Sequence, residues 1–183
     1  MQSDKFTALV RNAIGAAQSA ALAANHQKLT AEHVLAALLK DDNMTVKMLL
    51  AKAGADSASL SALLKAALDK FPQVTGSGAG QLQLDADLAR IFAAVEAEAK
   101  ARHDQFIAVD LLLLAMTKST GSVGKILKKA GVEPAPLGAA IDEIRKGRTA
   151  HSDAAEDSYD ALSRYTSDLT EAARNGKLDP VIG

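Results

Sequence analysis

The sequence of 183 residues contains no cysteine, which excludes disulfide bonds, thiolate nucleophiles and zinc sites that need sulfur ligands. A chain without cysteine fits most easily in a reducing compartment, so we expect a cytoplasmic location. Proline is also scarce, with four residues, and aromatic side chains make up only 3% of the chain. This composition excludes collagen-like and low-complexity structure, and the lack of aromatic residues disfavours β-sheet.

Long apolar stretches are missing as well. The most apolar run, residues 106–116, is interrupted by Asp110 and is much shorter than the roughly 20 residues that a transmembrane helix needs. The first residues show no basic segment followed by an apolar one, so no secretory signal is expected. The 21 basic residues are balanced by 22 acidic ones, which leaves no positive excess for phosphate groups. We therefore expect binding neither to membranes nor to nucleic acids.

Alanine is the abundant residue, with 38 copies. It has the highest intrinsic helix propensity of all residues. The chain is also long enough to form one core of about 150 residues. The sequence therefore predicts an all-α fold.

An internal repeat indicates the architecture. Residues 26–67 and 103–144 align without a gap at an offset of 77, and 11 of the 42 positions are identical. The alignment pairs His26 with His103, so we expect these two residues at equivalent helix ends. Apolar residues recur with a helical period in the segment before each repeat, and these two preceding segments match best after a shift of one residue.

The repeat predicts one domain over residues 1–147, made of two tandem units of about four helices each, 1–72 and 82–147. Neither unit is large enough to bury its apolar stripes alone, so we expect the two units to pack about a pseudo-twofold axis. Helix boundaries are expected from four signals. These are capping by Thr30 and Asp56, stops at Gly54 and Gly131, a start at Pro134 and an end at Gly147.

The periodic pattern ends after Gly147. Residues 148–165 are rich in polar and charged side chains, and we interpret them as a linker. The last segment, 166–183, contains a short helical pattern that ends before Pro180.

Catalytic and metal-binding motifs are not found. Residues 121–126 resemble a phosphate-binding P-loop, but two residues instead of four separate the glycines, and Ile126 replaces the required hydroxyl residue. The stretch 76–78 lacks the spacing of a nucleophile elbow. The four histidines never have the spacing of metal ligands on a helix. We therefore expect no catalytic residue, no metal site and no cofactor in this chain.

Two acidic residues lie close to the apolar helix predicted over 109–118. Asp110 is in its first turn and Asp104 precedes it by six residues. One interpretation is structural, with each carboxylate serving as a helix-dipole partner or turn former at about 0.3–1 kcal/mol. The other places them on the rim of an apolar groove between the two units, where they would orient the amides of a bound peptide.

The sequence resembles the Clp/Hsp100 family. Residues 169–183 resemble the start of the first AAA+ ATPase module of these unfoldases, and the duplicated unit resembles the Clp N-terminal domain. Segments 71–76, 106–110 and 155–169 are most similar to the ClpB branch of disaggregase chaperones. The ClpC branch repeats a Gly-Thr-Glu-His-like start in both units, and the second unit here departs from it. On this resemblance, 166–183 is the beginning of the first AAA+ module.

The resemblance implies a stress-response domain that binds unfolded or aggregated polypeptides and passes them to a hexameric, ATP-driven ring. ATP, Mg²⁺, the middle coiled coil, cooperation with the DnaK system and hexamer formation would belong to modules that this sequence lacks. We therefore expect a monomer without ATPase activity. Two alternatives stay open, namely an adaptor-binding domain of the ClpA/ClpC kind and a structural cap that binds no client.

The resemblance also implies which residues handle the substrate. A hydroxyl early in the first helix and two acids near the second unit's apolar helix correspond here to Thr7, Asp104 and Asp110. Apolar residues on the neighbouring helices are candidates for the lining of the groove, although each of them could equally be part of the core. These candidates are Val10, Ile14, Phe92, Val95 and Leu111.

Overall fold

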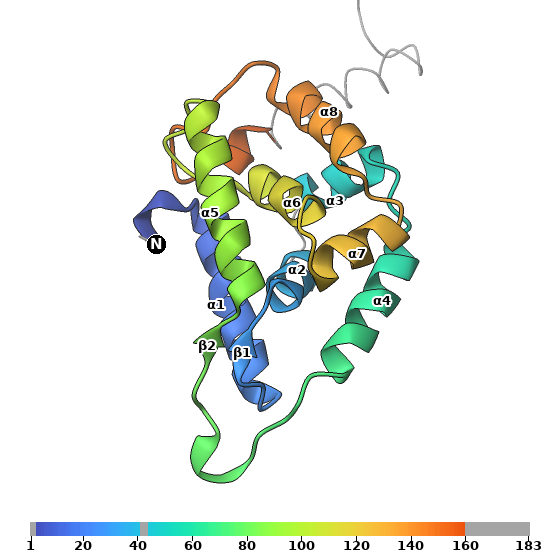
Figure 1. Ribbon diagram of the computed structural model, residues 1–183. Helices are drawn as coiled ribbons and strands as arrows, with labels where there is room; N and C mark the ends of the chain where they lie inside the picture. Colours follow the sequence, from blue (N-terminus) through green and yellow to red (C-terminus); the bar gives the residue numbers. More distant parts are fainter. Residues whose placement is uncertain (1–2, 41–43, 160–183) are drawn as a thin grey trace, which may run out of the picture.

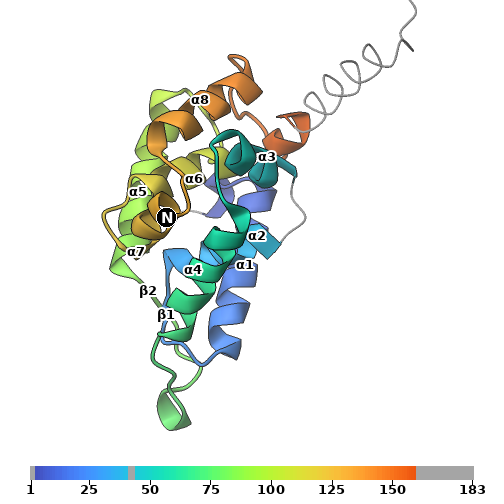
Figure 2. The same cartoon turned by 90° about the vertical axis from the view of Figure 1, so that its right-hand side faces the viewer.

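The computed structural model describes residues 3–40 and 44–159, in which the helices α1 to α8 follow one another as two sets of four and residues 155–159 form a further helical turn (Figure 1). The first unit contains η1 (Ser3–Lys5), α1 (Ala8–Ala23), β1 (Lys28–Leu29), α2 (Ala31–Lys40), α3 (Met44–Lys52) and α4 (Ser57–Asp69). The second contains β2 (Gln83–Leu84), α5 (Ala86–Ala101), α6 (Val109–Thr117), α7 (Ser122–Lys129) and α8 (Pro134–Arg145). The connection carries a single turn, η2 (Gly76–Gly78), and extends beyond the helices (Figure 2). The predicted all-α repeat fold is confirmed.

Most of the predicted helix boundaries are present in the structure. The Asp56 side chain accepts a hydrogen bond from the Ser59 amide at 3.1 Å and caps α4. Gly54 and Gly131 follow α3 and α7 with φ of 85° and 89°, a left-handed conformation that other residues rarely adopt. Pro134 begins α8, where its missing N–H costs no helical hydrogen bond.

The two units interlock across short backbone pairings. Strand β1 pairs in parallel with β2, with Leu29 opposite Leu84, and Phe6 forms an isolated bridge with Ile107. The segment that leads into the first helix of each unit therefore pairs with the segment before the second helix of the other unit. Helix α3 likewise packs on α8, and α4 packs on α7. This exchange is the pseudo-twofold arrangement that the repeat predicted.

Helix α6 is the centre of the core. All its residues from Val109 to Met116 are buried, and it packs against α3, α5, α7 and α8. Figure 1 shows it enclosed by these helices. A central helix can be apolar all round. Among the described residues, no helix has the length and the apolar character needed to cross a membrane.

The structure corrects the register of the repeat. Helices α1 and α5 begin 78 residues apart, which agrees with the shift of one residue expected for the first helices. Helices α2 and α6 also begin 78 apart, whereas Gly54 and Gly131 are 77 apart. The His26 amide donates to the carbonyl of Ala21, and the Asp104 amide donates to that of Ala99. His26 therefore corresponds to Asp104, and the predicted equivalence of His26 and His103 is wrong. An ungapped alignment fails here because the offset is 78 at the starts of the first three helices and 77 at the glycines that follow the third.

Residues 148–159 belong to the folded domain. The Ala150 carbonyl accepts the amides of Gln105 and Phe106 at 2.8 and 3.0 Å. Ala155 and Tyr159 are buried in the core cluster. The linker predicted over 148–165 is thus wrong for its first twelve residues, because their few apolar side chains find a tertiary contact without any periodicity. Residues 160–165 and the AAA+ start predicted at 166–183 lie outside the described residues.

Candidate functional site

The two predicted acidic residues share one buried arginine. Arg145, at the end of α8, donates from Nε and Nη2 to the two carboxylate oxygens of Asp110 at 2.6 and 2.9 Å. Its Nη1 donates to both oxygens of Asp104 at 2.9 Å. Arg145 is 3% exposed and Asp110 is 2% exposed. Burial by itself lowers the pKa of Arg145, but the hydrogen bonds and charges of Asp110 and Asp104 raise the pKa above its ordinary value.

Thr7 contacts a third buried carboxylate, that of Glu156, which the sequence did not indicate. The hydroxyl of Thr7, at the N-terminus of α1, donates to Glu156 Oε1 at 2.6 Å, and the Val109 amide donates to the same oxygen at 2.9 Å. Glu156 is 2% exposed. Burial raises its pKa, although these hydrogen bonds oppose the shift. Glu156 follows α8 in a polar stretch without periodicity, so no sequence signal could have identified it.

The structure therefore brings Thr7, Asp104 and Asp110 together, but inside the domain. Thr7 shares Glu156 with the amide of Val109, the residue before Asp110, and Asp110 shares Arg145 with Asp104. All three side chains are buried. The prediction that the two acids lie on the rim of an open groove is wrong, because Arg145 pairs with both buried carboxylates and the amides of Ala150 and Leu111 donate to them.

The five predicted apolar residues form no open groove between the units. Four of them are buried in the common core, and Phe92 packs on Phe6 with a ring-centroid distance of 5.5 Å. The fifth, Ile14, is partly buried against the same core. The buried four are Val10, Phe92, Val95 and Leu111.

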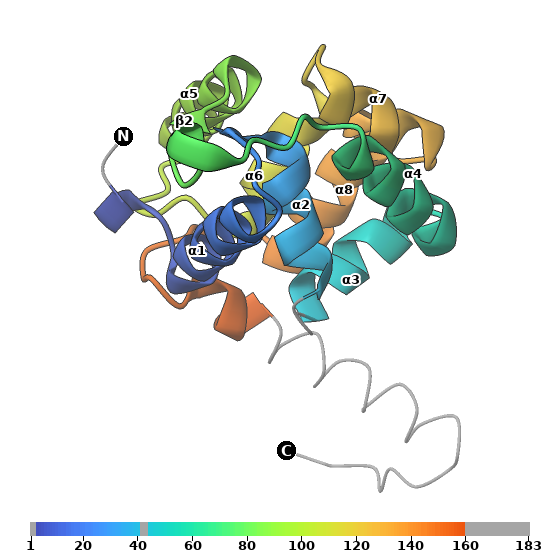
Figure 3. The ribbon, with the colours of Figure 1, turned by 90° about the horizontal axis from the view of Figure 1, so that it is seen from below.

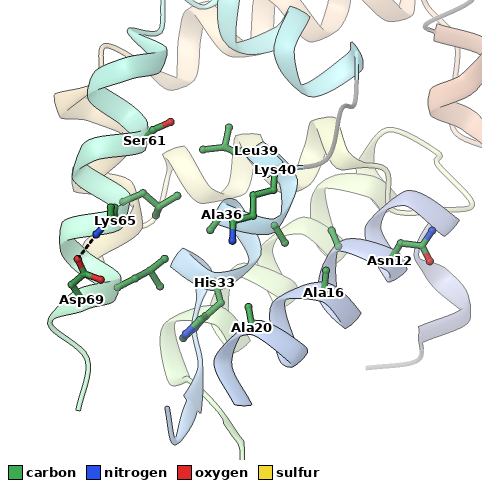
Figure 4. A pocket seen from close by; sticks show the side chains of 14 residues that line it. Asn12, Ala16, Ala20, His33, Ala36, Leu39, Lys40, Ser61, Lys65 and Asp69 are labelled. Carbon is green, nitrogen blue, oxygen red and sulfur yellow. Dashed lines mark hydrogen bonds and ion pairs between the residues drawn. The ribbon is translucent and has the colours of Figure 1, made fainter. Parts of the chain in front are cut away.

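An open apolar groove does exist, within the first unit. It lies between α1, α2 and α4, with α2 between the other two helices (Figure 3), and its volume is about 820 Å³. Figure 4 shows alanine side chains of α1 and α2 forming its floor. The lining consists of Asn12, Ala13, Ala16, Ala20, His33, Ala36, Ala37, Leu39, Lys40, Ser61, Leu64, Lys65, Leu68 and Asp69. None of the eight predicted site residues is among them.

Polar groups lie mainly at the edges of this groove. Lys65 pairs with Asp69 at 2.9 Å along α4, and Lys40 ends α2 (Figure 4). The hollow itself comes from side-chain size, because the facing positions Ala16, Ala20 and Ala36 leave the space that larger residues would fill. Such a pattern of an apolar floor with a few polar groups is typical of ligand-binding clefts.

His33 is the polar group of the floor. Its Nδ1 accepts from the Thr30 amide at 3.1 Å, so the ring proton is on Nε2 and is directed at Nδ1 of His26, 2.8 Å away. Phe71 covers both rings, at 5.5 Å from each. Burial and the neighbouring His26 lower the pKa of His33 to about 4, so His33 is neutral at pH 7. Thr30 thus contacts His33 rather than the helix amides that the sequence predicted.

The second unit has a smaller counterpart of the groove. This cavity has a volume of about 370 Å³, and six of its seven lining residues lie 78 positions after a lining residue of the larger groove. The lining consists of Ala94, Ala97, Glu98, Leu111, Leu114, Ala115 and Lys118. Leu114 and Glu98 stand where the first unit has alanines. In the described part of the chain, no group of three or more His, Asp or Glu residues is placed to hold a metal ion.

Comparison with known proteins settles the family. The sequence profile of the Clp repeat (R) N-terminal domain matches residues 5–164. The chain belongs to this family. The Chaperone protein ClpB of Rhodopseudomonas palustris is 46% identical over 184 residues, which cover 100% of this chain and 21% of the relative. The ClpB of Rickettsia typhi is 36% identical over 183 residues with the same coverage.

Solved structures share the fold of this Clp N-terminal domain. The Hsp104 N-terminal domain from Candida albicans superposes with a TM-score of 0.73 at 20% identity, covering 83% of this chain and 99% of that one. A complex of the ClpV N-domain with a VipB peptide has a TM-score of 0.62 at 16% identity, covering 81% and 91%. The predicted resemblance to the N-terminal domain of ClpB-type Clp/Hsp100 chaperones is confirmed. The chain spans about a fifth of the length of the curated relatives it matches.

Proposed function

We propose that this Clp N-terminal domain recognises substrates for a ClpB-type disaggregase, and that the groove between α1, α2 and α4 binds exposed apolar segments of unfolded or aggregated polypeptides. The observation that supports this proposal is the groove itself, an apolar hollow of about 820 Å³ with polar groups at its edges. Monomeric proteins rarely leave large apolar patches open unless the patches bind something.

The lining suits a ligand without a fixed sequence. Alanine side chains offer shape and apolar area but few directed hydrogen bonds, so any large aliphatic or aromatic side chain can occupy the hollow. Burying one such side chain contributes about 1.5–3 kcal/mol. Association and ordering of a flexible chain cost several kcal/mol, so one or two anchors give weak binding. Weak binding is useful to a domain that must release diverse clients.

The remaining functions that the resemblance implies concern a longer chain. A hexameric ring with several copies of this domain would raise the effective concentration of the groove around one client. ATP-driven threading, with ATP and Mg²⁺ bound in other modules, and cooperation with the DnaK system are proposals at the same level. No step of that chemistry is assigned to the described residues.

A second candidate is the binding of one defined partner segment, as in an adaptor-binding domain. It is favoured by the solved complex of the ClpV N-domain with a VipB peptide, a neighbour that shares this fold. The two candidates differ in client preference, because a recognition domain for unfolded protein prefers the unfolded form of a client, whereas an adaptor-binding domain prefers a folded partner.

Fluorescence anisotropy with a labelled, permanently unfolded protein, such as reduced and carboxymethylated lactalbumin, tests the proposal. Ala16→Glu places a charge in the groove at an exposed helical position, so we expect affinity to fall at least tenfold. The matched control is Ala62→Glu, on an exposed face of α4 outside the groove, and it should leave affinity unchanged. Equal affinities for the two variants, or a preference for the folded form of the client, would contradict the proposal.

A further inference from the structure

We infer that Thr7, Asp104 and Asp110 act together with Arg145 and Glu156 as an internal latch, which holds residues 148–159 against the domain. This latch sets the direction in which the chain leaves the Clp N-terminal domain. In the longer relatives, the chain around this domain makes up most of the protein, so such a latch would control how the domain is oriented toward the rest.

The first part of the latch joins the segment to one helix of each unit. Glu156 Oε1 accepts the Thr7 hydroxyl at the start of α1 and the Val109 amide at the start of α6. Helix N-termini carry partial positive charge and unpaired amides, so a carboxylate is well placed at both. The first amide of α1, at Ala8, donates to the carbonyl of Asp153 at 2.8 Å. The start of α1 is thus capped by the segment itself.

The second part fixes the beginning of the segment. Asp104, held by Arg145, accepts the Ala150 amide at 3.0 Å, and the Ala150 carbonyl accepts two amides from the same loop. Farther along, the guanidinium groups of Arg145 and Arg148 lie 5.5 and 5.3 Å from the centre of the Tyr159 ring. Arg145 therefore contacts the acids of the second unit on one side and the end of the segment on the other.

The character of these contacts indicates a releasable attachment. The segment contributes few large apolar side chains to the core, and much of its attachment is ionic or hydrogen-bonded. The Tyr159 hydroxyl is buried and has no hydrogen-bond partner among the described residues, and Glu156 is an ionisable group held out of water. Both features cost free energy in the attached state and are relieved when the segment detaches. Loss of any one polar partner should shift the balance toward release.

The latch is separate from the groove. No latch residue lines the cavity between α1, α2 and α4. The roles in substrate handling that the family resemblance implies for Thr7, Asp104 and Asp110 are thereby explained through the position of the domain, without contact between these buried side chains and a client. These three are positioning residues.

Hydrogen exchange of the 183-residue chain, followed by NMR, tests the latch. Glu156→Ala should raise the exchange rates of the amides of residues 150–159 and of Ala8 and Val109 at least tenfold. Exchange in α2 and α4 should stay within a factor of about two. The matched control is Glu143→Ala, which removes an exposed partner of Lys52 that forms no hydrogen bond or ion pair with the described residues 150–159, and it should change none of these rates.

A pair of conservative variants covers the case in which Glu156→Ala fails to fold. Thr7→Val keeps the shape but removes the hydroxyl and should release the segment, whereas Thr7→Ser keeps the hydroxyl and should restore protection. Unchanged exchange at 150–159 in Thr7→Val would overturn the latch, as would a rise that is equal throughout α1, α2 and α4.

Client binding supplies an independent readout. The affinity of Thr7→Val for the unfolded client should stay within twofold of the unmodified chain. A loss of fivefold or more with the segment still protected would place Thr7 in the binding surface and overturn the inference. If the unmodified chain binds no client at all, the proposed function fails, while the exchange measurement still decides whether the latch exists.

Discussion

Helices α1 and α2 of the first unit and α5 and α6 of the second occupy equivalent places, yet the cavities beside them differ more than twofold in volume. The backbone arrangement is repeated, so the difference comes from side chains. Ala20 and Ala36 in the first unit correspond to Glu98 and Leu114 in the second. A duplicated scaffold can therefore provide an open cavity in one unit and a filled one in the other through the size of a few side chains.

The buried polar residues of the two units also differ at equivalent positions. The first has the hydrogen-bonded pair His26 and His33 beneath Phe71. The second has Asp104, which corresponds to His26, and the nearby Asp110, both bound to Arg145. The position of Arg145 is occupied in the first unit by Leu68, which lines the groove. One unit therefore contains a buried histidine pair, and the other contains a buried ionic cluster.

The largest expected effect concerns the ionic cluster. Arg145→Met leaves two buried carboxylates without a cation, so we expect the free energy of unfolding to fall by about 3–5 kcal/mol. Urea unfolding measures the change. Arg102→Met, which breaks a partly exposed pair with Glu98 and Asp142, is the control and should cost less than about 1 kcal/mol. Similar losses for the two variants would show that burial of the Arg145 cluster does not increase its contribution to the free energy of unfolding.

Enlarging the second cavity should cost somewhat less. Leu114→Ala installs the residue found at the equivalent place in the first unit and removes a buried side chain, so we expect a loss of about 2–4 kcal/mol in the free energy of unfolding. Urea unfolding again measures it. A loss below about 1 kcal/mol would mean that the second unit also tolerates an open groove.

Lowering the pH should reduce the free energy of unfolding through protonation of His33 in the first unit. The pKa of His33 is about 4 in the folded chain and 6.5 when unfolded, so the unfolded chain takes up the proton first as the pH falls through 6.5. Between pH 7.5 and pH 5, the difference in proton uptake at His33 lowers the free energy of unfolding by about 2 kcal/mol. Urea unfolding at both pH values measures the change, and His33→Gln should reduce the pH dependence by that amount. An unaltered pH dependence in the variant would contradict the assignment.

The smallest expected effect comes from a substitution that fills the larger groove. Ala36→Leu installs the residue that the second unit carries at the equivalent place, and the leucine fills space that a client would occupy. We expect affinity for the unfolded client to fall about tenfold, or about 1.4 kcal/mol. Stability should change by less than about 1 kcal/mol, because Ala36 is only partly buried. Undiminished affinity would show that the groove between α1, α2 and α4 is not the binding site.

Local signals explain why the repeat and most helix boundaries could be predicted. These signals are alanine content, helical periodicity, a capping residue such as Asp56 and a helix stop such as Gly54. Each depends on residues that are close in the sequence, so it can be recognised without the tertiary structure. The shift of one residue between the first helices, α1 and α5, could be recognised from their periodicity. The register of the second helices, α2 and α6, could not be predicted from the ungapped alignment, because the units differ in length by one residue. The place of residues 148–159 was also unpredictable, since their few buried side chains have no periodic spacing.

The sequence by itself determined the helical units, their duplication and the family to which the chain belongs. Only the tertiary structure decided that Thr7, Asp104 and Asp110 meet inside the domain, and that the open groove lies within the first unit. The physical reason is distance along the chain. Glu156 reaches Thr7 across 149 residues, and the groove is lined by three separate helices, so both depend on packing that no local pattern encodes.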